Sequence, residues 1–154
     1  VDRGFSPGHR VPPGELPAGV VAPYLLHVGD LHERRNLGVA VKAVIEARRH
    51  CGASATLSLV LAGIDRGVTD GLCAIASNAG VPDAVVPLGT VSEERLRTLY
   101  QCADALVYPS LYEGFGLPLI EPIAICTPVI ASHAPSLPEL PGNAGVLLAP
   151  LAGP

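Results

Sequence analysis

Residues 113–121 read E-G-F-G-L-P-L-I-E and join a Gly-rich turn to an apolar segment with helical character. The residues before this stretch, A-D-A-L-V-Y-P-S (103–110), predict a short buried strand that ends in turn residues. The residues after it include T-P-V-I-A-S (127–132), which predicts another strand. The stretch therefore follows the carboxyl end of a strand, where open α/β sheets bind their ligands.

The turn itself has the features of an anion site. Gly114 and Gly116 let the backbone approach a ligand closely with its N–H groups bare. The helix expected to open near Leu117 directs its positive end at the same point. Glu113 stands at the mouth of the turn and Glu121 about one turn inside the helix, so both carboxylates can accept hydrogen bonds from hydroxyl groups. Phosphates and hydroxyl groups occur together in a sugar nucleotide.

Strand and helix patterns alternate along the rest of the chain. A helix is expected from Asn36, as its N-cap, to about His50, and another from the cap residue Ser92. A weaker helix is expected over 69–79. The expected strands are 24–28, 56–62, 84–88, 105–108, 128–132 and 146–148. This alternation predicts an α/β fold: a Rossmann-like open parallel sheet with helices on both faces.

The length of 154 residues is that of one domain. Residues 1–22 carry Pro and Gly clusters without periodicity and are expected to be an inter-domain linker, and residues 23–154 the domain itself. The sequence contains no Met, which indicates a fragment, and we expect it to be truncated at both ends.

Composition excludes several classes of protein. The net charge of −4 with a single Lys argues against nucleic-acid binding. Mean hydropathy is high, at +0.41, yet charges and prolines interrupt each apolar run before it reaches the length of a membrane span. The four cysteines lack metal-ligand or disulfide spacing, so reduced thiols in the cytoplasm are expected. His27, inside a strand, is expected to be a satisfied core residue.

The longer run Y-P-S-L-Y-E-G-F-G-L-P-L-I-E (108–121), with T-P-V-I-A-S after it, resembles the donor-binding core of the family 4 retaining glycosyltransferases. Two further segments also resemble that family: Y-L-L-H-V-G (24–29) its next strand, and R-R-N (34–36) its phosphate-contacting basic segment. The resemblance implies the C-terminal, donor-binding half of a two-domain GT-B fold.

The resemblance also implies roles for particular residues. Glu121 would hold the nucleotide ribose and Glu113 the transferred sugar. Backbone N–H groups of the turn would bind the diphosphate and the sugar; these belong to Gly114, Phe115, Gly116 and Leu117. Arg34 and Arg35 would stabilise the leaving diphosphate as negative charge builds on it, so no metal and no cofactor is expected.

Three positions depart from the family pattern. Arg35 stands where a Lys is usual. The positive charge is kept, but the compact ammonium group of Lys is replaced by a planar guanidinium. Asp30 places a carboxylate near the expected diphosphate, so it must turn away or pair with an arginine. Cys126 stands where a Gly is general.

The expected function is hexose transfer from a UDP- or GDP-sugar to an acceptor held by an absent N-terminal domain. The fragment alone is expected to be inactive, and the full enzyme to be cytoplasmic, with peripheral membrane association possible. Two alternatives stay open: a non-catalytic interaction module of the same fold, and another GT-B enzyme such as a sugar-nucleotide epimerase or a phosphorylase. The base, the hexose and the acceptor are not fixed by the sequence.

Overall fold

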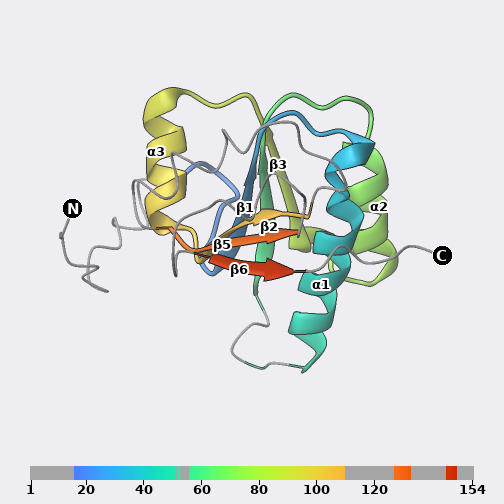
Figure 1. Ribbon diagram of the computed structural model, residues 1–154. Coiled ribbons are helices and arrows are strands. Elements are labelled where there is room, and N and C mark those ends of the chain that lie inside the picture. The colour runs from blue at the N-terminus through green and yellow to red at the C-terminus, as the bar shows by residue number, and fades with distance from the viewer. Residues whose placement is uncertain (1–15, 51, 53–55, 110–126, 133–144, 149–154) are drawn as a thin grey trace.

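The computed structural model describes residues 16–50, 52, 56–109, 127–132 and 145–148. These residues form one parallel sheet in the order β3-β2-β1-β4-β5-β6 (Figure 1). The strands are β1 (Tyr24–Val28), β2 (Ser58–Ala62), β3 (Val85–Gly89), β4 (Ala105–Tyr108), β5 (Val129–Ser132) and β6 (Gly145–Leu148). The predicted open parallel sheet is confirmed.

The strand order reverses once, between β1 and β4. From β1 the chain moves outward through β2 to β3, and from β4 it moves the other way through β5 to β6. In open α/β sheets such a switch point leaves a crevice at the carboxyl ends of the strands, where ligands bind. The stretch quoted first, residues 113–121, follows β4 in the sequence and so follows one of the two strands at this point.

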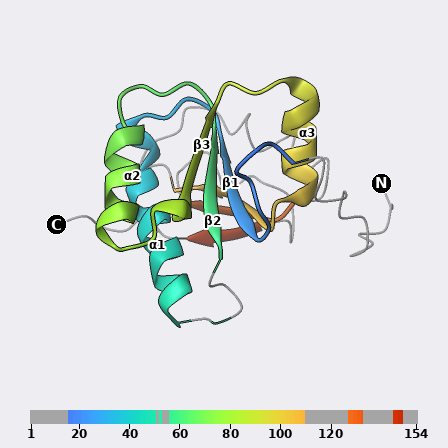
Figure 2. The ribbon, with the colours of Figure 1, turned by 180° about the vertical axis from the view of Figure 1, so that it is seen from behind.

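Helices cover both faces of the sheet. Helices α1 (Leu37–His50) and α2 (Thr69–Asn78) lie on one face and α3 (Glu93–Cys102) on the other (Figures 1 and 2). Strand β2 is buried along its whole length because its side chains alternate between the two layers. Leu59 and Leu61 pack in the cluster of α1 and α2, and Val60 and Ala62 in the cluster of α3. No helix among the described residues is long and apolar enough to cross a membrane.

Helix α3 begins as the sequence predicts. The Ser92 hydroxyl accepts a hydrogen bond from the N–H of Arg95 at 3.3 Å, and Glu93 and Glu94 occupy the positive first turn. The helix is fastened to the sheet at its other end, where the Tyr24 hydroxyl donates to Leu99 O at 2.7 Å. Burial raises the pKa of Tyr24, so this hydroxyl keeps its proton.

Asn36 directly precedes α1, as predicted, but it is not an extended N-cap. Its φ is 55° and its ψ is 35°, a left-handed conformation that Asn tolerates better than most residues. The reason is a short 3-10 helix, η2 (Glu33–Arg35), which the sequence pattern did not reveal. The Asn36 N–H closes η2 by donating to Glu33 O at 3.0 Å, so the chain turns sharply before α1 starts.

Some predicted boundaries shift by one or two residues. Strand β2 starts at Ser58 rather than 56, and β3 starts at Val85 because residues 82–84 form a second 3-10 helix, η4 (Pro82–Ala84). Strand β5 starts after Pro128, whose carbonyl oxygen accepts from the N–H of Leu106 at 2.7 Å. Val20, within the predicted linker 1–22, is buried in the core, whereas residues 1–15 lie outside the described part of the chain.

A single side chain ties the last turn of α1 to the residue before β2 and to η4. Arg48, in the last turn of α1, donates from Nε to Leu57 O at 2.6 Å. Its Nη1 lies 3.1 Å from both carboxylate oxygens of Asp83, and this contact lowers the pKa of Asp83. The Arg48 side chain is only 7% exposed, so the ion pair is shielded on the arginine side. The last turn of α1 is therefore anchored.

Candidate functional site

Beyond their carboxyl ends, β1 and β2 stay in close backbone contact. Gly29 N–H donates to Ala62 O at 2.9 Å, and Leu31 N–H donates to Ile64 O at 2.8 Å. A Cβ on Gly63 would overlap the carbonyl oxygen of Gly29, so this approach requires glycine. We call residues 29–31 and 62–66 the closed corner. Its backbone groups are engaged with one another.

On the other side of β1, the backbone pairing with β4 ends before the carboxyl end of the strand. Their pairing is recorded only at Leu25–Ala105 and Leu26–Leu106. Past this point side chains make the links: His27 Nδ1 donates to Val107 O at 2.9 Å, and the Tyr108 hydroxyl donates to Val28 O at 3.0 Å. The two rings lie 5.0 Å apart. We call this part of the switch point, residues 27–28 of β1 and 107–108 of β4, the opening.

His27 is fully buried in the opening. A carbonyl oxygen can only accept, so the bond to Val107 places the ring proton on Nδ1 and leaves a lone pair on Nε2. Within the described residues no donor reaches Nε2. Burial lowers the pKa of His27 to about 4, and the positive charge of Arg35 acts in the same direction, so the ring is neutral at pH 7. The prediction of a core residue is confirmed, with only one of the two nitrogens satisfied.

The predicted arginine pair comes from η2, immediately after β1. Arg35 is half-buried, and its Nη2 lies 3.7 Å from the position that a Cβ of Gly29 would occupy. Gly29 has φ 122°, a conformation that favours glycine, and it leaves room for the guanidinium. Arg35 therefore lies at the carboxyl end of β1, at the switch point. Arg34 is exposed.

Asp30 pairs with an arginine, which is one of the two predicted outcomes. The partner is Arg66, from the loop after β2, which the sequence analysis did not single out. Arg66 Nη2 and Nε donate to Asp30 Oδ2 at 2.8 Å and 3.1 Å. This hydrogen bond lowers the pKa of Asp30, and the positive charges of Arg66 and Arg35 act in the same direction. The available signal in the sequence was a basic residue in the loop after a predicted strand.

Asp65 fixes the loop that carries Arg66. Its Oδ1 accepts hydrogen bonds from the backbone N–H groups of Gly67, Val68 and Thr69, at 2.9, 2.9 and 3.1 Å. These bonds lower the pKa of Asp65 and satisfy donors at the start of α2. Asp65 also forms a parallel bridge with Leu31, which brings the loops after β1 and β2 together. The Asp30–Arg66 pair follows from that alignment.

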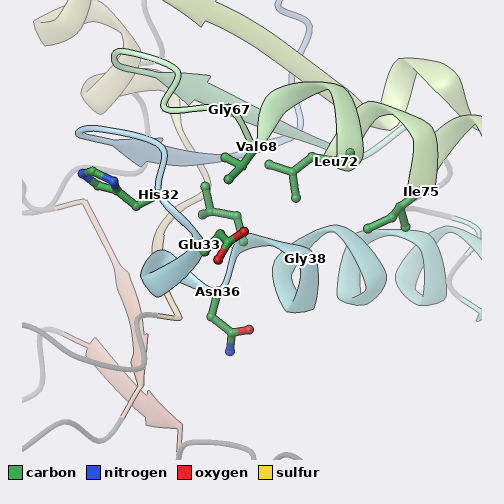
Figure 3. Close-up of a pocket in the computed structure, with 10 residues that line it drawn as sticks. His32, Glu33, Asn36, Gly38, Gly67, Val68, Leu72 and Ile75 are labelled. Carbon is green, nitrogen blue, oxygen red and sulfur yellow. The ribbon is translucent and has the colours of Figure 1, made fainter.

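An open groove lies between the first turns of α1 and α2 (Figure 3). It has a volume of about 380 Å³, and Val68, Leu72 and Ile75 form an apolar wall. Glu33 directs its carboxylate into the groove, whereas the Asn36 amide points away from it (Figure 3). Neither Arg34 nor Arg35 lines this groove. A carboxylate against an apolar wall does not suit a diphosphate, so the groove is distinct from the predicted anion site.

The remaining predicted site residues lie outside the described part of the chain. They are Glu113, Gly114, Phe115, Gly116, Leu117 and Glu121, together with Cys126. The strands before and after this segment are confirmed, because β4 ends at Tyr108 and β5 starts at Val129. How the two glutamates lie relative to Arg35 stays a prediction.

Within the described ranges, no group of His, Cys, Asp and Glu side chains could hold a metal ion. Cys73 and Cys102 are each half-buried. The other two cysteines, Cys51 and Cys126, lie outside those ranges.

A parallel sheet with a switch point and helices on both faces defines a Rossmann-like domain. The family described as "Glycosyl transferases group 1" matches residues 17–150, and the chain belongs to this family. O-antigen chain mannosyltransferase B of Escherichia coli is 33% identical over 129 residues, which are 82% of this chain and 33% of that protein. The chain thus spans about a third of the length of this relative.

Solved structures agree on the fold. The C-terminal domain of a glycosyl transferase group 1 family protein from Francisella tularensis superposes with a TM-score of 0.70 at 23% identity, covering 84% of this chain and 68% of that one. Anabaena HepE, solved in complex with UDP-glucose, superposes with a TM-score of 0.69 at 22% identity, covering 82% of this chain and 35% of that one. The fold is that of the C-terminal half of GT-B glycosyltransferases.

Proposed function

We propose that the chain is the donor-binding domain of a family 4 retaining glycosyltransferase. It would bind a nucleoside-diphosphate sugar and position the hexose for transfer to an acceptor held by another domain. The observation that carries this proposal is the place of Arg35: its guanidinium lies against Gly29, at the carboxyl end of β1 and beside the opening to β4. That is where open α/β sheets bind nucleotides.

The reaction needs positive charge at this place. When the bond between the sugar C1 and the phosphate oxygen breaks, negative charge accumulates on the leaving diphosphate. Arg35, with Arg34 from the same turn, would stabilise that charge without a metal ion. In this proposal Glu121 binds the ribose and Glu113 the hexose, and the backbone N–H groups of residues 114–117 bind the phosphates.

Two comparisons support a sugar nucleotide as ligand. The Escherichia coli relative is a mannosyltransferase, and the Anabaena protein was solved with UDP-glucose. We extend the proposal to a UDP- or GDP-hexose donor and to a cytoplasmic enzyme with peripheral membrane association. Because the acceptor site belongs to the other domain, we expect the isolated chain to bind donor without transferring the sugar.

Calorimetric titration of the chain with UDP, GDP and ADP, and with the matching nucleosides, tests this proposal. We expect a measurable heat of binding with at least one of the three nucleoside diphosphates. Arg35→Ala should weaken that diphosphate about tenfold, the equivalent of about 1.4 kcal/mol, and leave the nucleoside unchanged. Glu121→Ala should weaken the nucleotide and the nucleoside alike. Arg49→Ala is the matched control, because Arg49 is 56% exposed in the last turn of α1 and pairs only locally with Glu46.

The alternatives give different results. A non-catalytic module would show no heat with any of the three diphosphates. A phosphorylase would prefer inorganic phosphate to a nucleotide. An epimerase would bind the sugar nucleotide and convert the sugar itself, with no acceptor present. If Arg35→Ala and Arg49→Ala weakened diphosphate binding equally, Arg35 would not be a residue of the binding site.

A further inference from the structure

Arg66 belongs to the closed corner, and its backbone is fixed there by the loop that follows β1. Its N–H donates to Leu31 O at 3.1 Å, and the Leu31 N–H donates to Ile64 O at 2.8 Å. The next two backbone N–H groups bond to the Asp65 carboxylate. None of these bonds uses the Arg66 side chain. The loop therefore keeps its shape independently of the guanidinium that it presents at the carboxyl end of the sheet.

The guanidinium groups of Arg66 and Arg35 lie against neighbouring residues of one loop. Arg66 Nη2 and Nε donate to a single oxygen of Asp30, at 2.8 Å and 3.1 Å. Arg35 Nη2 lies 3.7 Å from the Cβ position of Gly29, the residue before Asp30. The hydrogen bond from Arg66 lowers the pKa of Asp30, and the charge of Arg35 acts in the same direction. Two arginines from different loops thus flank the carboxyl end of β1.

The pair with Asp30 leaves most of the Arg66 donors unused. A guanidinium has five N–H donors, and Asp30 accepts from two of them. In the described part of the chain no acceptor bonds to the others, and the Arg66 side chain is 49% exposed. An exposed ion pair of this kind adds little to the stability of a fold. The pair therefore suits a role in placing the guanidinium better than a role in stabilising the chain.

We propose that Arg66 is a second diphosphate-binding residue of the donor site and donates paired hydrogen bonds to the ligand beside Arg35. This inference rests on the proposed function. A diphosphate presents acceptor oxygens on two phosphoryl groups, and a planar guanidinium binds such oxygens through parallel N–H bonds. Asp30 has two opposing effects. It positions the Arg66 guanidinium, and its charge repels the ligand that the guanidinium binds.

The competing explanation is that Arg66 only neutralises the charge of Asp30. The two explanations differ in a chain that carries Asp30→Asn, because no carboxylate is left to neutralise. In that background we expect Arg66→Ala to weaken the nucleoside diphosphate that binds best among UDP, GDP and ADP about tenfold. Inorganic pyrophosphate should lose affinity to a similar degree, and the matching nucleoside should change less than twofold. Calorimetric titration of the 154-residue chain measures all three.

Arg66→Lys and Arg49→Ala, in the same Asp30→Asn background, are the controls. Arg66→Lys keeps the positive charge but lacks the planar fork, so it should recover only part of the affinity that Arg66→Ala loses. Arg49→Ala removes an equal charge from the last turn of α1, and it should change each affinity less than twofold. Because the backbone bonds of the loop do not involve the Arg66 side chain, all variants should unfold in urea close to the midpoint of the Asp30→Asn chain.

Three results would overturn the role of Arg66. One is a change of less than twofold in nucleoside diphosphate affinity when Arg66→Ala is added to the Asp30→Asn chain. Another is full affinity in Arg66→Lys, which would show that charge without paired hydrogen bonds is sufficient. The third is an equal loss of affinity for the nucleoside, which would indicate general structural damage.

Failure of the proposed function looks different. The unaltered chain would then give no heat with any of the three nucleoside diphosphates. If pyrophosphate still binds and still depends on Arg66, the phosphate contact stands and only the nucleotide is excluded. If pyrophosphate does not bind either, the role of Arg66 falls with the proposed function.

Discussion

The closed corner and the opening lie on the two sides of β1, yet they are held by different groups. In the closed corner, backbone bonds continue past the strands, as from Leu31 N–H to Ile64 O, and glycine lets the chains touch. In the opening, the ladder stops and the side chains of His27 and Tyr108 link the strands. Backbone contact leaves no room for a ligand. The switch point between β1 and β4 is therefore the place at this edge where the backbone pairing stops first, and it is where open α/β sheets bind ligands.

The strongest test of the closed corner is Gly63→Ala. The new Cβ would overlap the Gly29 carbonyl, and both groups are backbone, so no flexible side chain can yield. We expect a loss of at least about 3 kcal/mol in the free energy of unfolding, measured in urea. Gly71→Ala is the control, because nothing lies near its Cβ position in α2, and it should stabilise by about 0.5 to 1 kcal/mol. Equal effects of the two substitutions would show that the corner is not close-packed.

The opening should make stability depend on pH through His27. Its pKa is about 4 in the folded chain, against about 6.5 when unfolded. Between these values the unfolded chain binds the proton and the folded chain does not, so stability rises with pH. The contribution is fully present above pH 6.5 and falls by about 2 to 3 kcal/mol as the pH drops to 4.

Urea unfolding at several pH values, for the chain and for His27→Asn, measures this effect. The carboxylates titrate in both proteins, so the difference between the two isolates the imidazole. Parallel pH curves would contradict the burial of a neutral ring in the opening.

The smallest expected effect concerns the charge of the closed corner. Asp30→Asn removes a carboxylate near Arg35 and releases Arg66, so a diphosphate should bind several-fold more tightly. Arg66→Ala leaves Asp30 without its partner and should weaken the same ligand. Both side chains of the Asp30–Arg66 pair are exposed, so the two changes in affinity should both become smaller when calorimetry is repeated at high salt. Shifts of the same sign in the two variants would exclude an electrostatic cause.

The sequence predicted the elements that local patterns determine. Strands β1 and β4 have the predicted bounds because each is an apolar run flanked by Pro, Gly or turn residues. The N-cap at Ser92 could also be predicted from local sequence, because Ser92 is followed by Glu93 and Glu94, which favour the first turn of a helix. Arg35 could be placed at the site because the strand before it and the resemblance agreed on its position.

Other features depend on alignment between distant segments. The Asp30–Arg66 pair requires Leu31 to lie beside Asp65, a register that no local pattern specifies. The hydrogen bonds of His27 and Tyr108 across the opening lie beyond the end of the β1–β4 ladder at Leu26, which only the paired strands reveal. The roles of Glu113 and Glu121 lie outside the described residues and stay predictions.

The anchoring of α1 by Arg48 has a mechanical consequence. The helix has 14 residues and is therefore about 21 Å long, with its last turn pinned to β2 and η4 by a shielded guanidinium. Its first turn follows η2, which carries Arg35, and Leu37 and Ala40 of that turn are buried in the core. Both ends of the helix are therefore held, the last turn by an ion pair and the first by apolar packing, so the turn with Arg35 joins a rigid element.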